Sequence, residues 1–244
     1  MSKKKYDERV LAMTKQQHLV HYVLRTRFAR KGAVSYIGHL DLMNLFGRTV
    51  RKSGLPILYS QGFNPRPEMV FALPLGVGID TEGDYVDISM SVPIQPEEFV
   101  EKMTPLMPEG LSIVSVVYKD EPKNSLMSVV TMAEYAIKAP GITECVKKIM
   151  EMEVVEVEKK AKGKIVTNDI RPQLLELHED ASLPDCVEVL VKAGSTSNLR
   201  PESLLQACTR YAGLDSEEAS NAGVTRLCLY GGEYPNIKRI EEFT

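Results

Sequence analysis

The order of the predicted strands and helices constrains the fold of this chain more than any other feature, because one six-element order occurs twice. Each half gives strand, helix, strand, strand, helix and strand, with short extended segments added. Residues 21–30 show the strand pattern most clearly, since apolar and polar side chains alternate along them. The predicted helices are residues 39–54, 95–107, 143–152 and 200–213, and residues 154–170 predict a hairpin that turns at Lys162-Gly163.

This repeated order predicts an α+β fold made of two tandem ferredoxin-like (βαββαβ) domains with mostly antiparallel sheets. The second half has no visible sequence similarity to the first, so the repeat rests on element order alone. Residues 121–125, EPKNS, break the pattern and favour a boundary there. We therefore expect a flexible lead-in at 1–17, an amino-terminal domain at 18–124 and a carboxy-terminal domain at 125–244.

Composition excludes several classes of protein. No apolar run approaches 18 residues and the basic start has no apolar leader core, so we expect a cytoplasmic protein without a membrane partner. The four cysteines are widely spaced, without CxxC or CxxxCxxC, and no two histidines stand at i,i+4. We expect reduced buried thiols, no metal site and no cofactor.

The helix at 39–54 combines a buried stripe with the first candidate site. His39 and Asp41 stand in its first turn, where free backbone N–H groups and the positive end of the dipole lie. Asp41 either complements the dipole or contacts a ligand. His39 is a general base, a ligand contact or a packed loop residue, and the helix terminus favours its neutral form. The stripe consists of Leu42, Leu45, Phe46, Thr49 and Val50.

Residues 59–67, YSQGFNPRP, form the second candidate site, because nine residues are too many for a simple turn. Arg66 stands between two prolines that stiffen the chain, and a guanidinium held this way suits a phosphate or carboxylate. The alternative is a structural loop with Phe63 packed inward. Tyr59 and Phe63 could stack on a ring, while Ser60, Gln61 and Asn64 offer hydrogen bonds.

Other segments carry weaker patterns. Residues 74–78, PLGVG, resemble a phosphate-binding loop only slightly, and the acids that follow them, Glu82, Asp84 and Asp87, are expected to be solvated turn residues. Charge is uneven: residues 25–66 hold eight Lys or Arg against Asp41, so 8 − 1 = +7. That excess marks an anionic-ligand surface or a solvated face. Asp169, Arg171 and Arg200 are further weak candidates.

Taken in order, the arginine strand, the HLD helix, the YSQGFNPRP loop and the PLGVG turn resemble a known bacterial family. It is the domain of unknown function of radical-SAM-associated (radical-SAM-linked, DUF2344-type) proteins. The resemblance covers residues 20–130 strongly and continues more weakly to about 230. Two positions depart from the family pattern, Gly38 where Ser is common and Arg66 where His is frequent, so no catalytic loop histidine is expected.

The resemblance implies partnership with a B12-binding-type radical SAM enzyme, and the family's genomic setting implies RNA or translation. We therefore hypothesise an accessory or substrate-recognition protein, not catalytic on its own, that binds an anionic ligand, with RNA as one candidate. The alternatives are a stand-alone RNA-binding or RNA-processing protein and a small-molecule enzyme that uses His39 and Asp41. The expected ligand contacts are Arg25, Arg27, His39, Asp41, Arg48, Tyr59, Ser60, Gln61, Phe63, Asn64 and Arg66.

Overall fold

The computed structural model describes residues 22–120, 124–161, 164–180, 182–183 and 185–243. The predicted lead-in at 1–17 and the predicted turn at 162–163 lie outside the described residues. No helix in the described ranges is long and apolar enough to cross a membrane.

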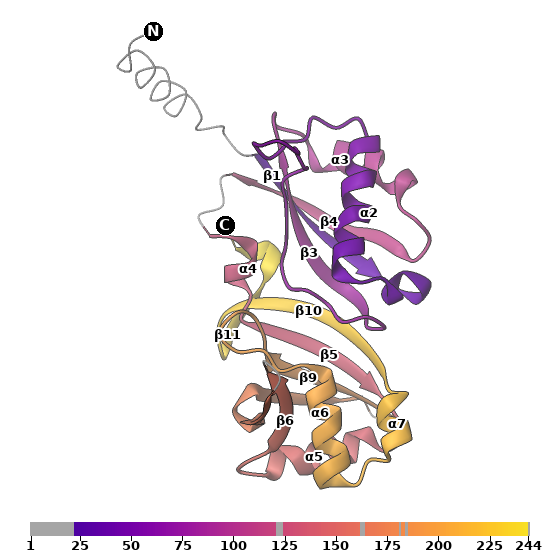
Figure 1. The fold of residues 1–244 in the computed structure, drawn as a ribbon, viewed down its shortest axis with the longest axis vertical. Coiled ribbons are helices and arrows are strands. Elements are labelled where there is room, and N and C mark those ends of the chain that lie inside the picture. The colour runs from indigo at the N-terminus through magenta and orange to yellow at the C-terminus, as the bar shows by residue number, and fades with distance from the viewer. Residues whose placement is uncertain (1–21, 121–123, 162–163, 181, 184, 244) are drawn as a thin grey trace, which may run out of the picture.

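The amino-terminal half packs two helices on one face of its strands (Figure 1). As predicted, α2 buries Leu42, Phe46 and Val50, and Gly54 follows its end with a φ of 69°. The α3 helix begins at Pro96, where a missing N–H costs nothing. The elements of this half are β1 (Tyr22–Arg30), α2 (His39–Lys52), β2 (Met69–Phe71), β3 (Asp80–Met90), α3 (Pro96–Met103) and β4 (Leu111–Asp120).

The carboxy-terminal half contains the predicted strands and helices, together with strands and short helices that the sequence did not predict. Strand β8 follows the predicted hairpin, and β11 with the short helix η5 (Ile240–Glu242) lies in the polar sequence at the carboxyl end. The elements are α4 (Leu126–Val129), β5 (Met132–Lys138), α5 (Ile142–Glu151), β6 (Glu156–Ala161), β7 (Lys164–Asp169), β8 (Leu174–Glu179), β9 (Cys186–Lys192), α6 (Pro201–Ala207), α7 (Ser216–Ser220), β10 (Gly223–Glu233) and β11 (Asn236–Arg239).

One nine-stranded sheet runs through both halves, in the order β4-β1-β3-β10-β5-β9-β8, with β2 on β3 and β11 on β10. If β11 is left aside and the remaining sheet strands of each half are numbered in chain order, both halves have the neighbour order 4-1-3-2 with antiparallel pairing. The halves meet through a short parallel pairing of β3 with β10. The predicted α+β class with mostly antiparallel pairing is thus confirmed.

The hydrophobic core also connects the halves. The amino-terminal core lies between α2, α3 and the sheet and includes Phe28, Phe46 and Phe99. The carboxy-terminal core extends across the junction, because it includes Ala72 and Ile79 from the amino-terminal half. The turn before β3 is therefore held by apolar contacts from the other half.

Residues 234–243, which we call the carboxy-terminal strap, cross from β10 back to the amino-terminal half. In Figure 1 the carboxyl end lies beside α4, on the face of the strands opposite α2 and α3. Ile240 is fully buried there. A chain end whose apolar side chain and backbone groups are buried is part of the fold.

Candidate functional site

The strand arginines Arg25 and Arg27 both face the carboxy-terminal strap, and Arg25 makes the closer contacts with it. Arg25 is buried and pairs with Asp87 through two bonds, Nε to Oδ1 at 2.8 Å and Nη2 to Oδ2 at 2.9 Å. Its Nη1 donates to the backbone oxygens of Ile240 and Phe243, both at 3.0 Å. Arg27 Nη1 lies 4.0 Å from Glu241. The guanidinium of Arg25 is thus occupied by internal partners.

A second buried ion pair joins the two halves, and the sequence did not predict it. Arg226 of β10 contacts Asp84 of β3, with Nε to Oδ1 at 2.7 Å and Nη2 to Oδ1 at 2.5 Å. Both side chains are almost fully buried, and Arg226 Nη2 also donates to the backbone oxygen of Leu73. Burial raises the pKa of Asp84, and Arg226 and Arg30 partly offset that rise. The pair therefore links the strands at the junction.

The expectation that Glu82, Asp84 and Asp87 are solvated turn acids was wrong for two of the three. Strand β3 begins at Asp80, so these acids lie within a strand and not in a turn. Asp84 and Asp87 are buried opposite arginines, whereas Glu82 is exposed and pairs with Lys31 at 2.8 Å. The neighbouring strand β1 carries arginines and no acids. These arginines were the available indication in the sequence that acids of β3 would be buried as ion-pair partners.

His39 and Asp41 occupy the predicted first turn of α2 but do not contact each other. The His39 ring stands edge-on to Phe71, with 5.5 Å between the centroids, and is half-buried. Asp41 is exposed. Half-burial lowers the pKa of His39, with Asp84 opposing and Arg30 adding to that shift. The predicted neutral form is therefore favoured, mainly through desolvation, and its use as a catalytic base stays a prediction.

This lowered pKa predicts a pH dependence of stability. The unfolded chain binds the His39 proton near the ordinary value of about 6.5, above the folded pKa. The stabilisation is therefore complete above that pH and is lost as the pH falls from about 6.5 toward the folded value. Urea unfolding from pH 7.5 to 5.5 should show a steeper loss for the wild type than for His39→Gln. Parallel curves for the two proteins would contradict this assignment.

The loop at 59–67 projects from the fold, so the alternative that Phe63 packs inward is wrong. Phe63 has a relative exposure of 106%, and residues 61–66 are all exposed. Backbone bonds close the base of the loop, from Ser60 N to Arg66 O at 2.8 Å and from Glu68 N to Leu58 O at 2.9 Å. The Ser60 hydroxyl accepts from the Arg66 N–H at 3.1 Å.

The structure separates the predicted contacts into distinct places. The loop follows the carboxyl end of α2, whose 14 residues make it about 20 Å long, whereas His39 begins that helix. The loop base also pairs with β3 near Met90, at the end of β3 remote from β10. Arg48 is exposed on α2. The loop therefore follows one end of α2 and the His39 turn forms the other.

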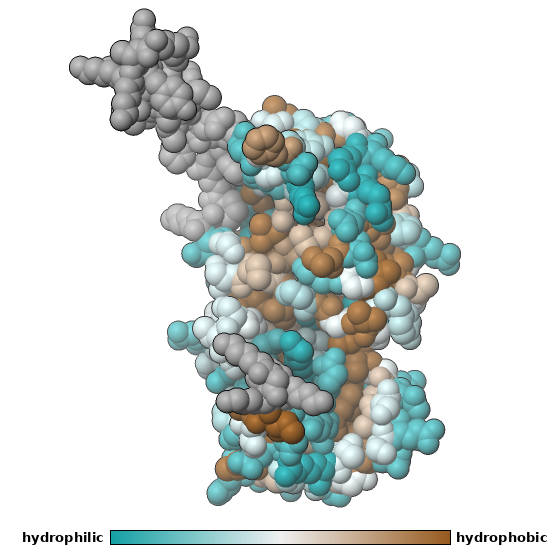
Figure 2. All heavy atoms as spheres, viewed as in Figure 1, coloured by the Kyte–Doolittle hydropathy of each residue, from teal (hydrophilic) through white to brown (hydrophobic). Residues whose placement is uncertain are grey.

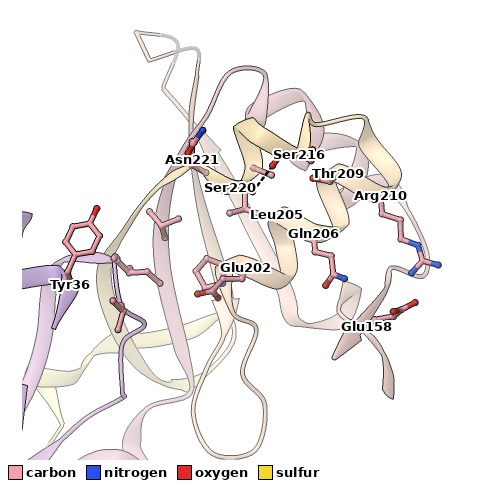
Figure 3. A pocket seen from close by; sticks show the side chains of 17 residues that line it. Tyr36, Glu158, Glu202, Leu205, Gln206, Thr209, Arg210, Ser216, Ser220 and Asn221 are labelled. Atoms are coloured by element: carbon pink, nitrogen blue, oxygen red, sulfur yellow. Dashed lines mark hydrogen bonds between the residues drawn. The ribbon is translucent and has the colours of Figure 1, made fainter. Parts of the chain in front are cut away.

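A cleft lies where the halves meet, and we call it the junction cleft. It has a volume of about 960 Å³, between Tyr36 with the turn at 77–79 on one side and α6, the π-helix Cys208–Ala212 and α7 on the other (Figure 3). Two smaller cavities of about 290 and 310 Å³ adjoin it, and Glu202 lines all three. The weakly marked PLGVG turn and the LRPES helix start therefore meet at this cleft.

Of the remaining weak candidates, Asp169 and Arg171 have structural contacts and Arg200 lies at a cavity. Asp169 Oδ1 accepts from the N–H groups of Val155 and Arg171, and Arg171 donates to the backbone oxygen of Met150. These two residues thus close the hairpin. Arg200 is exposed and lines the smaller cavities beside Glu202.

Comparison with protein families gives a match over most of the chain. A family described as an uncharacterized protein conserved in bacteria (DUF2344) matches residues 23–201, from the start of β1 to the first residue of α6. No curated protein matches the chain. The matched region holds the loop at 59–67, α2 and the PLGVG turn. The strap and most of the α6 wall of the junction cleft lie beyond it.

Proposed function

The chain belongs to this bacterial family of uncharacterized proteins, and we propose that it is an accessory recognition protein that works with a radical SAM enzyme. The proposed architecture is two ferredoxin-like halves that share a sheet, based on the 4-1-3-2 neighbour order in each. Support for the partner comes from the resemblance of the ordered sequence motifs to radical-SAM-associated proteins. The chain has no CxxxCxxC motif, so it would serve the enzyme and not replace it.

The observation that carries this proposal is the fully exposed Phe63 at the tip of a closed loop. A large aromatic side chain that is fully exposed offers apolar area for burial by a partner. Arg66 is exposed nearby and has no ion pair with a described residue. Aromatic and arginine side chains are the residues that most often dominate protein–protein binding energy. The hydrogen-bonded loop base lowers the ordering cost of binding.

The direct test is calorimetric titration with a B12-binding-type radical SAM enzyme, the proposed partner. We expect a complex, and we expect Phe63→Ala to weaken it about 10- to 100-fold because a buried aromatic anchor is lost. Val114→Ala is a suitable control, since Val114 is an exposed apolar residue on β4. Equal affinities for Phe63→Ala and the wild type would contradict docking through this loop.

A second candidate function is RNA binding, and the exposed cations of the amino-terminal half favour it. Arg48, Arg51 and Lys52 are exposed on α2, and Arg66 is exposed in the loop that follows. Phosphate contacts by such groups make affinity fall steeply with salt, and Phe63 could stack on a base. Titration of a single-stranded RNA at 50 and 200 mM salt separates the two functions. A protein partner held through Phe63 should show a weaker salt dependence.

A further inference from the structure

The junction cleft has the lining of a ligand site that lies apart from the proposed docking loop. The loop is at the far end of β3, whereas the cleft opens beside the start of β3 and beside β10. On the face shown in Figure 2, apolar side chains gather between the two halves. The apolar lining consists of Val77, Ile79, Leu205, Ala219, Ala222 and Val224.

Both walls of the cleft are held in place. On the amino-terminal side, Arg30 Nη2 donates to the backbone oxygens of Gly76 and Ile79 at 3.0 and 2.9 Å, and Gly78 N donates to Ser35 O at 2.8 Å. On the other side, α6 buries its opposite face in the core. Fixed walls lower the ordering cost that a ligand must overcome.

The charged side chains of the lining give the cleft an acidic centre. Glu202 and Gln206 extend from α6 into the space between Tyr36 and Glu158 (Figure 3). Glu202 has no ion pair with any residue in the described ranges, and Arg200 lies beyond ion-pair distance. The Arg210 guanidinium is directed to other partners, because it lies 5.2 Å from the Tyr211 ring centroid and contacts Glu156 O. Glu202 and Glu158 are therefore the acidic groups of the lining, and Glu202 stands nearer its centre (Figure 3).

A π-helix supplies part of the same wall. Cys208–Ala212 continues α6 with π-type bonding and brings Thr209 and Arg210 to the cleft. Single π turns are rare and occur frequently at functional sites. This backbone feature is independent of the charge pattern and lies at the same place.

We infer that the junction cleft binds a molecule with a primary ammonium or guanidinium group on an apolar stem. The cationic group contacts the Glu202 carboxylate, a charge-assisted bond, and the stem lies on the apolar lining. The exposed Tyr36 ring at the rim adds a cation–π contact. The source is either a free polyamine or a Lys or Arg side chain of a protein. This inference does not depend on the radical SAM partner.

The test is calorimetric titration of the full chain with two probes, spermidine and the peptide Gly-Lys-Gly. We expect at least one to bind, and Glu202→Gln, which keeps the shape but removes the charge, to weaken binding about tenfold or more. Glu217→Gln is the matched control on the exposed first turn of α7 and should leave affinity unchanged. A thermal melt of each variant confirms that it is folded.

The two probes distinguish the two sources of the cationic group. Spermidine binding alone identifies a free amine, and peptide binding that is equal or tighter identifies a protein side chain; both support the inference. Absence of binding by either probe, or binding that Glu202→Gln leaves unchanged, overturns it. Inorganic phosphate that binds the wild type and is lost in Arg210→Ala overturns the cationic class. None of these results bears on whether Phe63 docks a radical SAM enzyme.

Discussion

Replacement of Arg226 by Met is expected to lower the free energy of unfolding by about 3–5 kcal/mol. The variant leaves the Asp84 carboxylate buried at the junction without its partner, and it removes a donor from the backbone oxygen of Leu73. The cost of an uncompensated buried charge exceeds the cost of the lost apolar contacts. Urea unfolding at neutral pH measures the change, and Arg48→Met on the exposed face of α2 is the control, expected within about 0.5 kcal/mol.

A double variant separates the cost of the unpaired buried charge from the cost of lost packing at this site. Arg226→Met with Asp84→Leu removes both charges and should recover most of the loss, because well-packed apolar replacements of a buried pair are often neutral. A small effect of Arg226→Met alone, below about 1 kcal/mol, would show that the pair does not hold the junction.

Replacement of Arg25 by Met is expected to cost a similar amount, about 3–5 kcal/mol, and also to release the carboxy-terminal strap. This variant leaves Asp87 unpaired and removes the Arg25 donor from the backbone oxygens of Ile240 and Phe243. Amide hydrogen exchange should therefore rise in residues 236–243 before the rest of the chain opens.

Arg27→Met provides the matched control for the strap. Arg27 lies on the same strand and faces the same segment, but its contact with Glu241 is long, at 4.0 Å, and partly exposed. Its loss should cost no more than about 1 kcal/mol. Equal strap protection in Arg25→Met and the wild type would contradict the role assigned to Arg25.

Local patterns predicted most of the elements of this fold. The apolar stripe of α2, the Pro96 start of α3 and the Pro201 start of α6 depend on residues close in sequence, and the structure confirms them. The pairing of β3 with β10 brings together residues about 145 positions apart, which no local pattern encodes. The strap was missed because its composition is polar and its burial depends on Arg25.

The candidate site was predictable only in part, for the same reason. Residues 59–67 were predicted to be more than a simple turn, and their exposure and hydrogen-bonded base agree with that prediction. The sequence alone could not show which arginines are buried in ion pairs and which are exposed. Arg25 pairs internally because β3 and the strap supply its partners, whereas Arg66 stays exposed. The junction cleft needs both halves, so its centre at Glu202 carried no sequence pattern.

The most direct test of the proposed recognition function is amide hydrogen exchange with and without a B12-binding-type radical SAM enzyme, the proposed partner. Docking through the exposed loop predicts slower exchange in residues 60–66 of the complex, with the strap unchanged. A complex that leaves this loop unprotected, or no complex at concentrations of about 100 μM, would contradict the account.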